Sequence, residues 1–248
     1  MEDEQRADLI RYVQKRWGGA HALRLASGGA TPGTLPTGFP KLDELLGGGL
    51  PAGRITTLRS GPTSGATTIA HTIVATAQRA ERVPVYVDAA HCYDPATGAR
   101  VGVDFDRLTI VRPEDPVEAL AVATTLARSG GFDLLVFDSL SVQHQGMLST
   151  WLACMATLLH AADTALLLLA STWRGDSYPG GQALAHYSSL ILNARREGWV
   201  RTPPGSIAGV RTRISIVKNK TAPPGGTVDL EVPTGALSPA PREAATWT

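Results

Sequence analysis

Ten residues near the start of the chain have the types and the spacing of a loop that binds phosphate. The stretch from Arg59 to Thr68 reads RSGPTSGATT, between an apolar run and a segment rich in Ala, Ile and Val. Such a loop uses glycines that let backbone N–H groups turn towards phosphates, a Lys that reaches them, and a Ser or Thr hydroxyl for Mg²⁺. Ser60 takes the place of the first Gly, Gly65 that of the second, and Thr67 supplies the hydroxyl. Ala66 stands where the Lys belongs, so the stretch predicts a nucleotide-binding loop without its cation.

Few other residues have a pattern that could do chemistry. The run DLLVFD ends in Asp138, an acid at the end of an apolar segment, which is where parallel sheets place ligand-binding groups. The alternative is an Asp that caps the segment after it. His91, His144 and His160 have no carboxylate or Ser partner at motif spacing, and we assign no catalytic role to them.

The elements that must position these residues are apolar strands alternating with helices. Strands are expected at 54–58, 84–88, 108–111, 134–138 and 165–170, and helices at 41–46, 67–80, 117–129, 145–162 and 183–189. Residues 89–98 are expected to form a loop. Alternation with short connections predicts an α/β fold with a mostly parallel sheet covered on both faces. Short segments between Pro and Gly turns, at 190–193, 198–201, 213–217 and 228–232, predict an antiparallel meander that extends the sheet.

The chain is expected to have three parts. Residues 1–34 combine an amphipathic helix, over about 3–17, with a linker rich in Gly, Thr, Pro and Ser. A helix of this length is marginal in water, so we expect its apolar face to pack on the main domain or on a neighbouring protomer. Residues 35–234 form the α/β core, and residues 235–248 lack periodicity and are expected to be disordered.

Composition excludes several classes of protein. With 248 residues, 43% of them hydrophobic, and a net charge of +1, the chain can bury a full core and has no global basic field. Seven basic residues against one acid between positions 195 and 220 form a local patch, suited to a phosphate backbone or to an acidic partner surface. The acidic start lacks a signal-peptide core, the longest apolar run is too short for a membrane span, and a cytoplasmic location is expected. Cys92 and Cys154 lack metal-ligand spacing, which indicates reduced structural thiols.

The order of these segments resembles that of the bacterial RecA recombinase family, from about Gln5 to Val232. The resemblance rests on TG at 37–38 with LD at 42–43, GGGLPAGR, the degenerate phosphate loop, VDAAHCYDP at 87–95, GVDFDRL at 102–108, DLLVFDSL at 133–140, GGQAL at 180–184 and VKNK at 217–220. It implies a RecA-like P-loop NTPase core with ATP and Mg²⁺ as cofactors and an N-terminal helix that docks on the next subunit. It also implies that the family's C-terminal domain is absent, so complete strand exchange is not expected.

The resemblance gives the nucleotide site its expected roles. Asp138 matches the Walker B acid, which with Thr67 would hold Mg²⁺. Ala90 stands where the family carries the Glu that activates water. Asp94 matches a residue near the adenine, but Thr97 replaces the usual stacking aromatic. The residues expected at the degenerate nucleotide site are Ser60, Gly61, Pro62, Thr63, Ser64, Gly65, Ala66, Thr67, Thr68, Asp94 and Asp138.

Two alanines at catalytic positions favour a pseudo-ATPase. A missing general base costs about 10²–10⁴-fold in rate. A missing Lys removes contacts worth about ten- to a hundredfold in affinity. ATP and Mg²⁺ are therefore expected to bind weakly or not at all, although backbone amides at a helix N-terminus could still hold a phosphate.

Further positions match the family's interface and DNA contacts. Lys218 and Lys220 match a pair that reaches a neighbour's γ-phosphate, and the alternative is a solvated pair on an edge strand. The second DNA-binding loop corresponds to residues 171–181. The side chains expected to bind DNA, there and in the basic patch, are Trp173, Arg174, Tyr178, Arg195 and Arg196. The alternative is an ordinary surface loop with a packed Trp.

Three functional readings follow. The first is an ATPase-impaired RecA relative in DNA repair or the SOS damage response, which binds single-stranded DNA weakly or modulates a RecA filament. ImuA-type mutagenesis accessories and SulA-like proteins are similar truncated relatives. The second is an active DNA-dependent ATPase that uses Lys218 or Lys220 in trans, and the third is a structural subunit that assembles with itself.

Overall fold

The computed structural model describes residues 11–12, 15, 33–141, 144, 146–171, 181–202 and 206–233. The chain divides into two compact units, Met1–Pro32 and Gly33–Thr248. In the first unit, Arg11, Tyr12 and Lys15 are helical, and the remainder of the helix expected over 3–17 lies outside the described residues. The tail expected to be disordered, at 235–248, also lies outside them.

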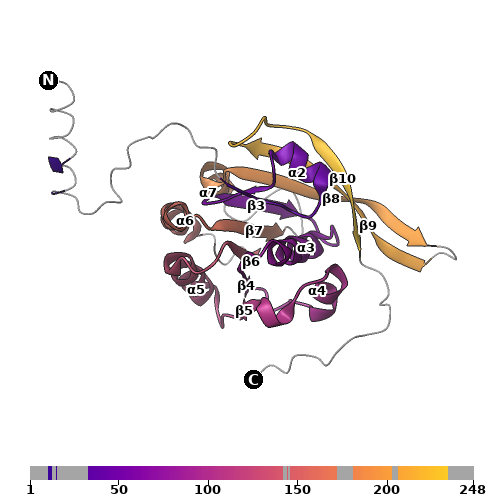
Figure 1. The fold of residues 1–248 in the computed structure, drawn as a ribbon, viewed down its shortest axis with the longest axis horizontal. Helices are drawn as coiled ribbons and strands as arrows, with labels where there is room; N and C mark the ends of the chain where they lie inside the picture. Colours follow the sequence, from indigo (N-terminus) through magenta and orange to yellow (C-terminus); the bar gives the residue numbers. More distant parts are fainter. Residues whose placement is uncertain are drawn as a thin grey trace. The chain divides into compact units, whose positions relative to one another are not determined.

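The second unit is built on an eight-stranded sheet with the order β10-β9-β8-β3-β7-β6-β4-β5 (Figure 1). Neighbours from β8 to β5 are parallel, whereas β8, β9 and β10 are antiparallel to one another. This arrangement confirms the expected α/β fold, including the antiparallel extension. The strands are β3 (Ile55–Ser60), β4 (Pro84–Asp88), β5 (Thr109–Val111), β6 (Leu134–Leu140), β7 (Ala165–Ser171), β8 (Leu190–Thr202), β9 (Ser206–Asn219) and β10 (Thr227–Pro233), with β1 (Thr34–Leu35) and β2 (Leu50–Pro51) paired separately.

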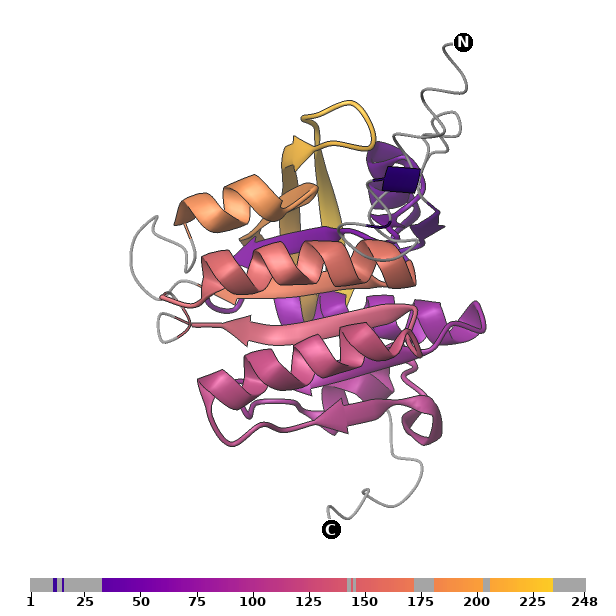
Figure 2. The same cartoon turned by 90° about the vertical axis from the view of Figure 1, so that its left-hand side faces the viewer.

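Helices cover both faces of the sheet, with α3 and α4 on one face and α5, α6 and α7 on the other (Figures 1 and 2). The helices are α2 (Pro40–Leu46), α3 (Ala66–Arg79), α4 (Pro95–Val101), α5 (Pro116–Ser129), α6 (Leu148–Ala162) and α7 (Gly181–Tyr187), with a 3₁₀ turn at Phe105–Arg107. None of the helices in the described part of the chain is long and apolar enough to cross a membrane.

Residues 134–137 of β6 do not alternate between apolar and polar because both faces of this strand are buried. Leu134 and Val136 belong to the hydrophobic core on the side of α3, while Leu135 and Phe137 belong to the core on the side of α5 and α6. Successive side chains of a strand point to opposite faces, so a strand buried on both faces must be apolar throughout. The polar residues of the strand, Asp138 and Ser139, come where β6 approaches the loops at its carboxyl end.

Two expectations about secondary structure were wrong. Residues 89–98 were expected to be a loop, but Pro95 begins helix α4, because the Asp94 side chain caps it and Pro is favoured in the first turn. The segments at 190–193 and 198–201 were expected as separate strands, but both belong to β8. Pairing with β9 extends along β8 through irregularities in register, which absorb the residues that interrupt the pattern.

Candidate nucleotide site

The loop that joins β3 to α3 has the expected strand, turn and helix. β3 ends at Ser60 and α3 begins at Ala66. Between them, Thr63 and Gly65 have φ values of 58° and 82°. Gly65 adopts this left-handed conformation without strain, whereas a β-branched residue such as Thr63 rarely does. Ala66 is 8% exposed and apolar, so the first residue of the helix supplies no charge to the loop.

Strands β9 and β10 hold this loop from the side. The buried hydroxyl of Thr212, on β9, donates a hydrogen bond of 2.7 Å to the backbone oxygen of Ser64. A β-carbon on Gly65 would lie 3.2 Å from Val232 Cγ1 of β10. The antiparallel strands therefore fix the shape of the loop, although the loop lacks its Lys.

Asp138 lies beside the start of α3, where its match to a Walker B acid predicts it. Its Oδ2 accepts hydrogen bonds from Thr67 Oγ1 at 3.4 Å and from the Tyr86 hydroxyl at 2.6 Å. Burial raises the pKa of Asp138 above its ordinary value, and the hydrogen bond from Tyr86 acts in the opposite direction. Thr67 and Asp138 are the donor set that would hold Mg²⁺, and bound Mg²⁺ would neutralise phosphate charge. Their fit to the ion is partial, because Tyr86 already occupies the carboxylate oxygen that faces Thr67.

Ala90, which stands where the resemblance predicts a general base, lies beside Asp138. Ala90 follows β4, and its N–H donates a hydrogen bond of 3.0 Å to the backbone oxygen of Asp138. A methyl group can neither accept a proton nor orient a water molecule. The site therefore brings together the hydroxyl and the acid of a nucleotide-binding fold without the base and without the Lys.

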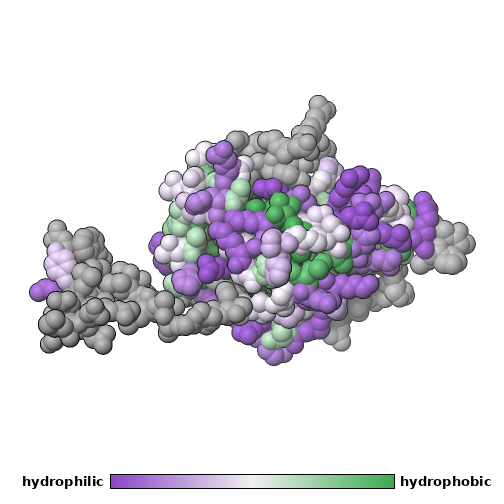
Figure 3. All heavy atoms as spheres, turned by 90° about the horizontal axis from the view of Figure 1, so that it is seen from above, coloured by the Kyte–Doolittle hydropathy of each residue, from purple (hydrophilic) through white to green (hydrophobic). Residues whose placement is uncertain are grey.

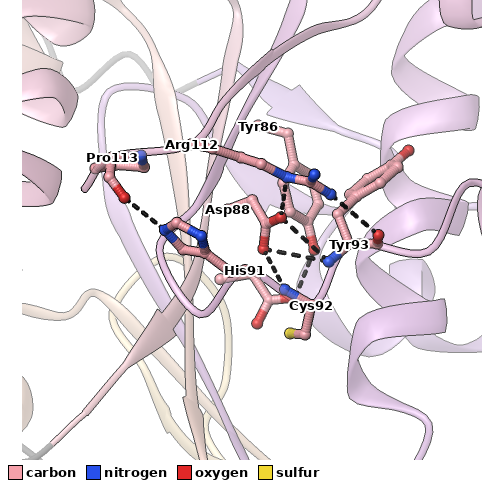
Figure 4. Close-up of polar contacts among 8 residues, drawn as sticks. Tyr86, Asp88, His91, Cys92, Tyr93, Arg112 and Pro113 are labelled. Atoms are coloured by element: carbon pink, nitrogen blue, oxygen red, sulfur yellow. Dashed lines mark hydrogen bonds and ion pairs between the residues drawn. The ribbon is translucent and has the colours of Figure 1, made fainter. Parts of the chain in front are cut away.

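A buried carboxylate that sequence reasoning missed supports this corner of the site (Figure 4). Asp88 is 0% exposed, and its Oδ2 forms an ion pair of 2.8 Å with Arg112 Nε. Its Oδ1 accepts hydrogen bonds from the N–H groups of Cys92 at 2.9 Å and Tyr93 at 3.2 Å. These bonds fix the turn that carries Ala90. The available signal was the repeated pattern of an apolar strand ending in Asp, at 84–88 and again at 134–138.

Three buried aromatic side chains pack behind Asp138, and their polar groups were also missed. The ring centroid of His71 lies 4.6 Å from that of Tyr93 and 5.5 Å from that of Tyr86. Neither ring nitrogen of His71 has a hydrogen-bond partner among the described residues. Burial lowers the pKa of His71 to about 4, so the imidazole is neutral at physiological pH. Periodicity alone places His71 in α3 but cannot show that it faces two tyrosines.

Asp94, expected near the adenine, caps helix α4 in the structure. Its side chain accepts hydrogen bonds from the N–H groups of Ala96 at 3.0 Å and Thr97 at 3.2 Å, and from the Thr97 hydroxyl at 2.6 Å. The bond from Thr97 is the largest cause that lowers the pKa of Asp94. Asp94 therefore binds Thr97, the residue that replaces the stacking aromatic, and contact of Asp94 with a base stays a prediction.

The lysines expected to act in trans have different surroundings. Lys218 Nζ donates hydrogen bonds to the backbone oxygens of Ala185 at 2.5 Å and His186 at 3.4 Å, near the end of α7. Burial, followed by the nearby charge of Lys220, lowers the pKa of Lys218. Lys220 is exposed. Their action on a neighbour's nucleotide stays a prediction.

The basic patch is less positive than the count over 195–220 indicates. Strand β10 adds two acids to it: Asp229 accepts hydrogen bonds from Arg213 at 2.8 and 2.9 Å, and Glu231 lies 3.6 Å from Arg211. Arg195 remains 84% exposed and lies 3.9 Å from Glu197. The described part of the patch therefore mixes ion pairs with exposed arginines.

Arg196 lies at the phosphate loop. Its Nη1 donates a hydrogen bond of 2.7 Å to Thr63 Oγ1, and its guanidinium carbon lies 4.9 Å from the ring centroid of Trp199. The residues expected in the second DNA-binding loop, Trp173, Arg174 and Tyr178, lie outside the described residues. DNA binding by any of these side chains stays a prediction.

Exposed apolar side chains occur on the same strands. Trp199 on β8 and Ile207 and Val217 on β9 are among the large hydrophobic residues that remain exposed. Seen from above, the molecule shows hydrophobic surface set among hydrophilic side chains (Figure 3). Arginines and single exposed apolar residues therefore share the antiparallel part of the sheet.

Comparisons with known proteins agree with this fold. The family model described as the RecA N-terminal domain matches residues 6–145 and 171–236. Protein RecA of Thermus aquaticus is 32% identical over 265 residues, which cover 94% of this chain and 77% of that protein. Protein RecA of Methylococcus capsulatus is 30% identical over 263 residues, covering 94% and 76%. Protein RecA of Chlamydia pneumoniae is 33% identical over 243 residues, covering 87% and 69%.

Proposed function

Because the chain belongs to the RecA family, we propose that it is a DNA repair and recombination accessory that does not hydrolyse ATP. It acts on a RecA filament, or within one, as a capping or modulating subunit. It contacts single-stranded DNA weakly, through the exposed arginines of β8 and the segment that carries Trp173, Arg174 and Tyr178.

The observation that carries the proposal is the combination of a retained scaffold with two alanines. The loop, Thr67 and Asp138 keep the arrangement of a nucleotide site, while Ala66 and Ala90 remove its Lys and its base. Loss of the base lowers the rate of the chemical step by about 10²–10⁴-fold. Loss of the Lys removes a charge-assisted contact that stabilises both bound nucleotide and transition state. Both losses fall on hydrolysis, whereas strands β9 and β10 still hold the loop in shape.

A retained fold without catalysis suits a subunit that occupies a place in a filament. If nucleotide turnover releases the subunits of a filament, a subunit that cannot turn over would persist where it binds. Such a subunit changes the rate at which its neighbours leave. This reasoning favours a modulator over an independent recombinase.

The proposal is tested by adding the protein to preformed RecA filaments on single-stranded DNA and following disassembly and strand exchange. A change in either rate at substoichiometric protein supports modulation. No effect on either rate at a molar excess would contradict it. Arg195→Gln serves as a comparison, because an effect that needs DNA contact should weaken in this variant whereas an effect through protein contacts should persist.

Simple assays distinguish the two alternative functions, an active ATPase and a structural subunit. An active ATPase would hydrolyse ATP in the presence of single-stranded DNA, and Lys220→Ala would abolish that turnover if the Lys acts in trans. A structural subunit would assemble with itself, without RecA and without DNA, which light scattering or sedimentation detects.

A further inference from the structure

Strand β8 brings a cation to the phosphate loop from outside the loop. β8 runs parallel to β3, and Ala194 pairs with Ser60, the last residue of β3. Two residues further along, Arg196 lies level with the loop, and its Nη1 donates a hydrogen bond of 2.7 Å to Thr63 Oγ1. No Lys approaches the loop from α3, because that position is Ala66.

An irregularity in β8 places Arg196 and Trp199 on the same face. Arg196 pairs with Thr212 of β9, but Gly198 pairs with the next residue, Arg211, so Glu197 is an extra residue in β8. Residues three apart in a regular strand point to opposite faces, and one extra residue restores them to the same face. The guanidinium carbon of Arg196 consequently lies 4.9 Å from the Trp199 ring centroid.

The face that carries Arg196 is the face that holds the loop. Thr212, which pairs with Arg196, donates its hydroxyl to the backbone oxygen of Ser64. Arg195 points to the other face, where it lies near Glu197. Two adjacent arginines of one strand therefore have different surroundings, and only Arg196 contacts the phosphate loop in the described structure.

The partners of Arg196 leave its charge available. In the described part of the chain they are a hydroxyl and an indole ring, and neither neutralises a guanidinium. Arg211 and Arg213, on the neighbouring strand, each lie close to a carboxylate of β10. A guanidinium fixed by stacking on an aromatic ring and by one hydrogen bond keeps further N–H donors for an anion.

A second feature of the loop also indicates an anion. The Ser64 side chain is 2% exposed, and its hydroxyl has no hydrogen-bond partner among the described residues. A buried hydroxyl without a partner is unfavourable, and a phosphate oxygen in the loop would supply one. The N-terminal amides of α3, a helix of 14 residues, open onto the same loop.

We propose that Arg196 takes over in cis the role of the missing Lys, so that the loop binds the polyphosphate of a nucleoside triphosphate without hydrolysing it. This rests on the part of the proposed function in which the fold is retained and catalysis is lost. Arg forms paired hydrogen bonds with phosphate, and its charge is independent of pH. Because Ala90 offers no base, the bound triphosphate stays intact and holds the loop and β8 together.

The test measures the affinity of the full-length protein for ATP by calorimetry, with and without Mg²⁺. Arg196→Gln keeps most of the side-chain length and removes the charge, and it should weaken ATP binding by about ten- to a hundredfold. Arg196→Lys should recover part of the loss. Arg128→Gln, an exposed residue near the end of α5, controls for the change in net charge and should leave the ATP affinity within about twofold of wild type.

Further arms identify the ligand and the residue. Arg195→Gln removes an equal charge from the other face of β8. Comparing its ATP affinity with that of Arg196→Gln distinguishes a direct contact with the loop from an effect of the overall positive charge of the strand. Equal ATP affinities for Arg196→Gln and wild type, or equal losses in Arg195→Gln and Arg196→Gln, would overturn the assignment. So would a wild-type protein that is folded and does not bind ATP at millimolar concentration. Loss of affinity for a single-stranded oligonucleotide in Arg196→Gln, with ATP affinity unchanged, would assign the residue to DNA instead.

These outcomes are distinguishable from failure of the proposed function. Hydrolysis of ATP by the wild-type protein would contradict the proposed loss of catalysis and the statement that the bound triphosphate stays intact, whereas the ATP affinity of Arg196→Gln decides whether Arg196 binds the phosphates. An unchanged affinity in Arg196→Gln, together with absent hydrolysis, would overturn this inference alone.

Discussion

The substitution Arg112→Met tests whether the buried ion pair with Asp88 stabilises the fold around the candidate nucleotide site. Arg112 Nε lies 2.8 Å from Asp88 Oδ2, and the Asp88 side chain is 0% exposed whereas that of Arg112 is 34% exposed. Removing one partner of a buried pair costs about 3–5 kcal/mol, because the other charge remains buried. Two backbone N–H groups still bind Asp88, and Arg112 is partly solvated, so we expect a loss of about 2–3 kcal/mol.

A loss of this size is measurable in a domain of this length. One kcal/mol shifts the melting temperature by about 2–4 °C for 150–250 residues, so Arg112→Met should melt about 4–12 °C below wild type. Urea unfolding, followed by circular dichroism, gives the free energy of unfolding directly. The matched control is Arg107→Met, which removes a pair of 2.9 Å between exposed side chains, Arg107 and Glu81, and should cost less than about 1 kcal/mol. If Arg112→Met costs no more than Arg107→Met, the reasoning about the Asp88 cluster is wrong.

Two further substitutions have effects whose dependence on pH follows from the structure. Tyr86→Phe removes the hydrogen bond of 2.6 Å to Asp138 and should cost about 1.5–3 kcal/mol. Burial raises the folded-state pKa of Asp138, so ionisation destabilises the fold as pH rises through that pKa, and Tyr86 reduces this cost. The free energy of unfolding that Tyr86→Phe loses, measured in urea, should therefore be larger at pH 8 than at pH 4.5. An equal loss at both pH values would refute this role of Tyr86. Asp94→Ala removes the cap of α4 and should cost about 1 kcal/mol at pH 7. Because hydrogen bonding lowers the folded-state pKa of Asp94, this contribution is present above the unfolded pKa and disappears as pH falls through the folded pKa. Thermal unfolding of Asp94→Ala and wild type at pH 7 and pH 2.5 checks this prediction. A loss of stability that persists at pH 2.5 would show that the carboxylate is not the cap.

Much of the fold could be predicted from the sequence because its strands are buried on both faces. Apolar runs such as 134–138 and 165–170 leave little choice of structure, and helices of 14 or 15 residues between them have clear periodicity. Helix α4 was missed because its seven residues include Pro95 and Gly98 and show no apolar periodicity. The available signal was Asp94 followed by Pro95, an N-cap and a first-turn proline, which lay within a stretch interpreted as a nucleotide-binding loop.

The local parts of the candidate site could be identified from the sequence, whereas its long-range contacts could not. The phosphate loop and Asp138 are local motifs, and the structure brings them together as expected. The contact of Arg196 with Thr63 depends on the parallel register of β8 and β3 and on the extra residue at Glu197, and neither can be read from local spacing. A count of charge along the chain likewise omits the acids that β10 brings to the basic strands.

Hydrolysis of ATP by the wild-type protein, beside an Ala66→Lys, Ala90→Glu double variant and in saturating single-stranded DNA, tests the central claim most directly. We expect no turnover above background for the wild type. We expect measurable turnover for the double variant, because the loop, Thr67 and Asp138 are already in place. Turnover by the wild type that Lys220→Ala abolishes would contradict the account, since it would show an active ATPase that obtains its Lys from a neighbouring subunit.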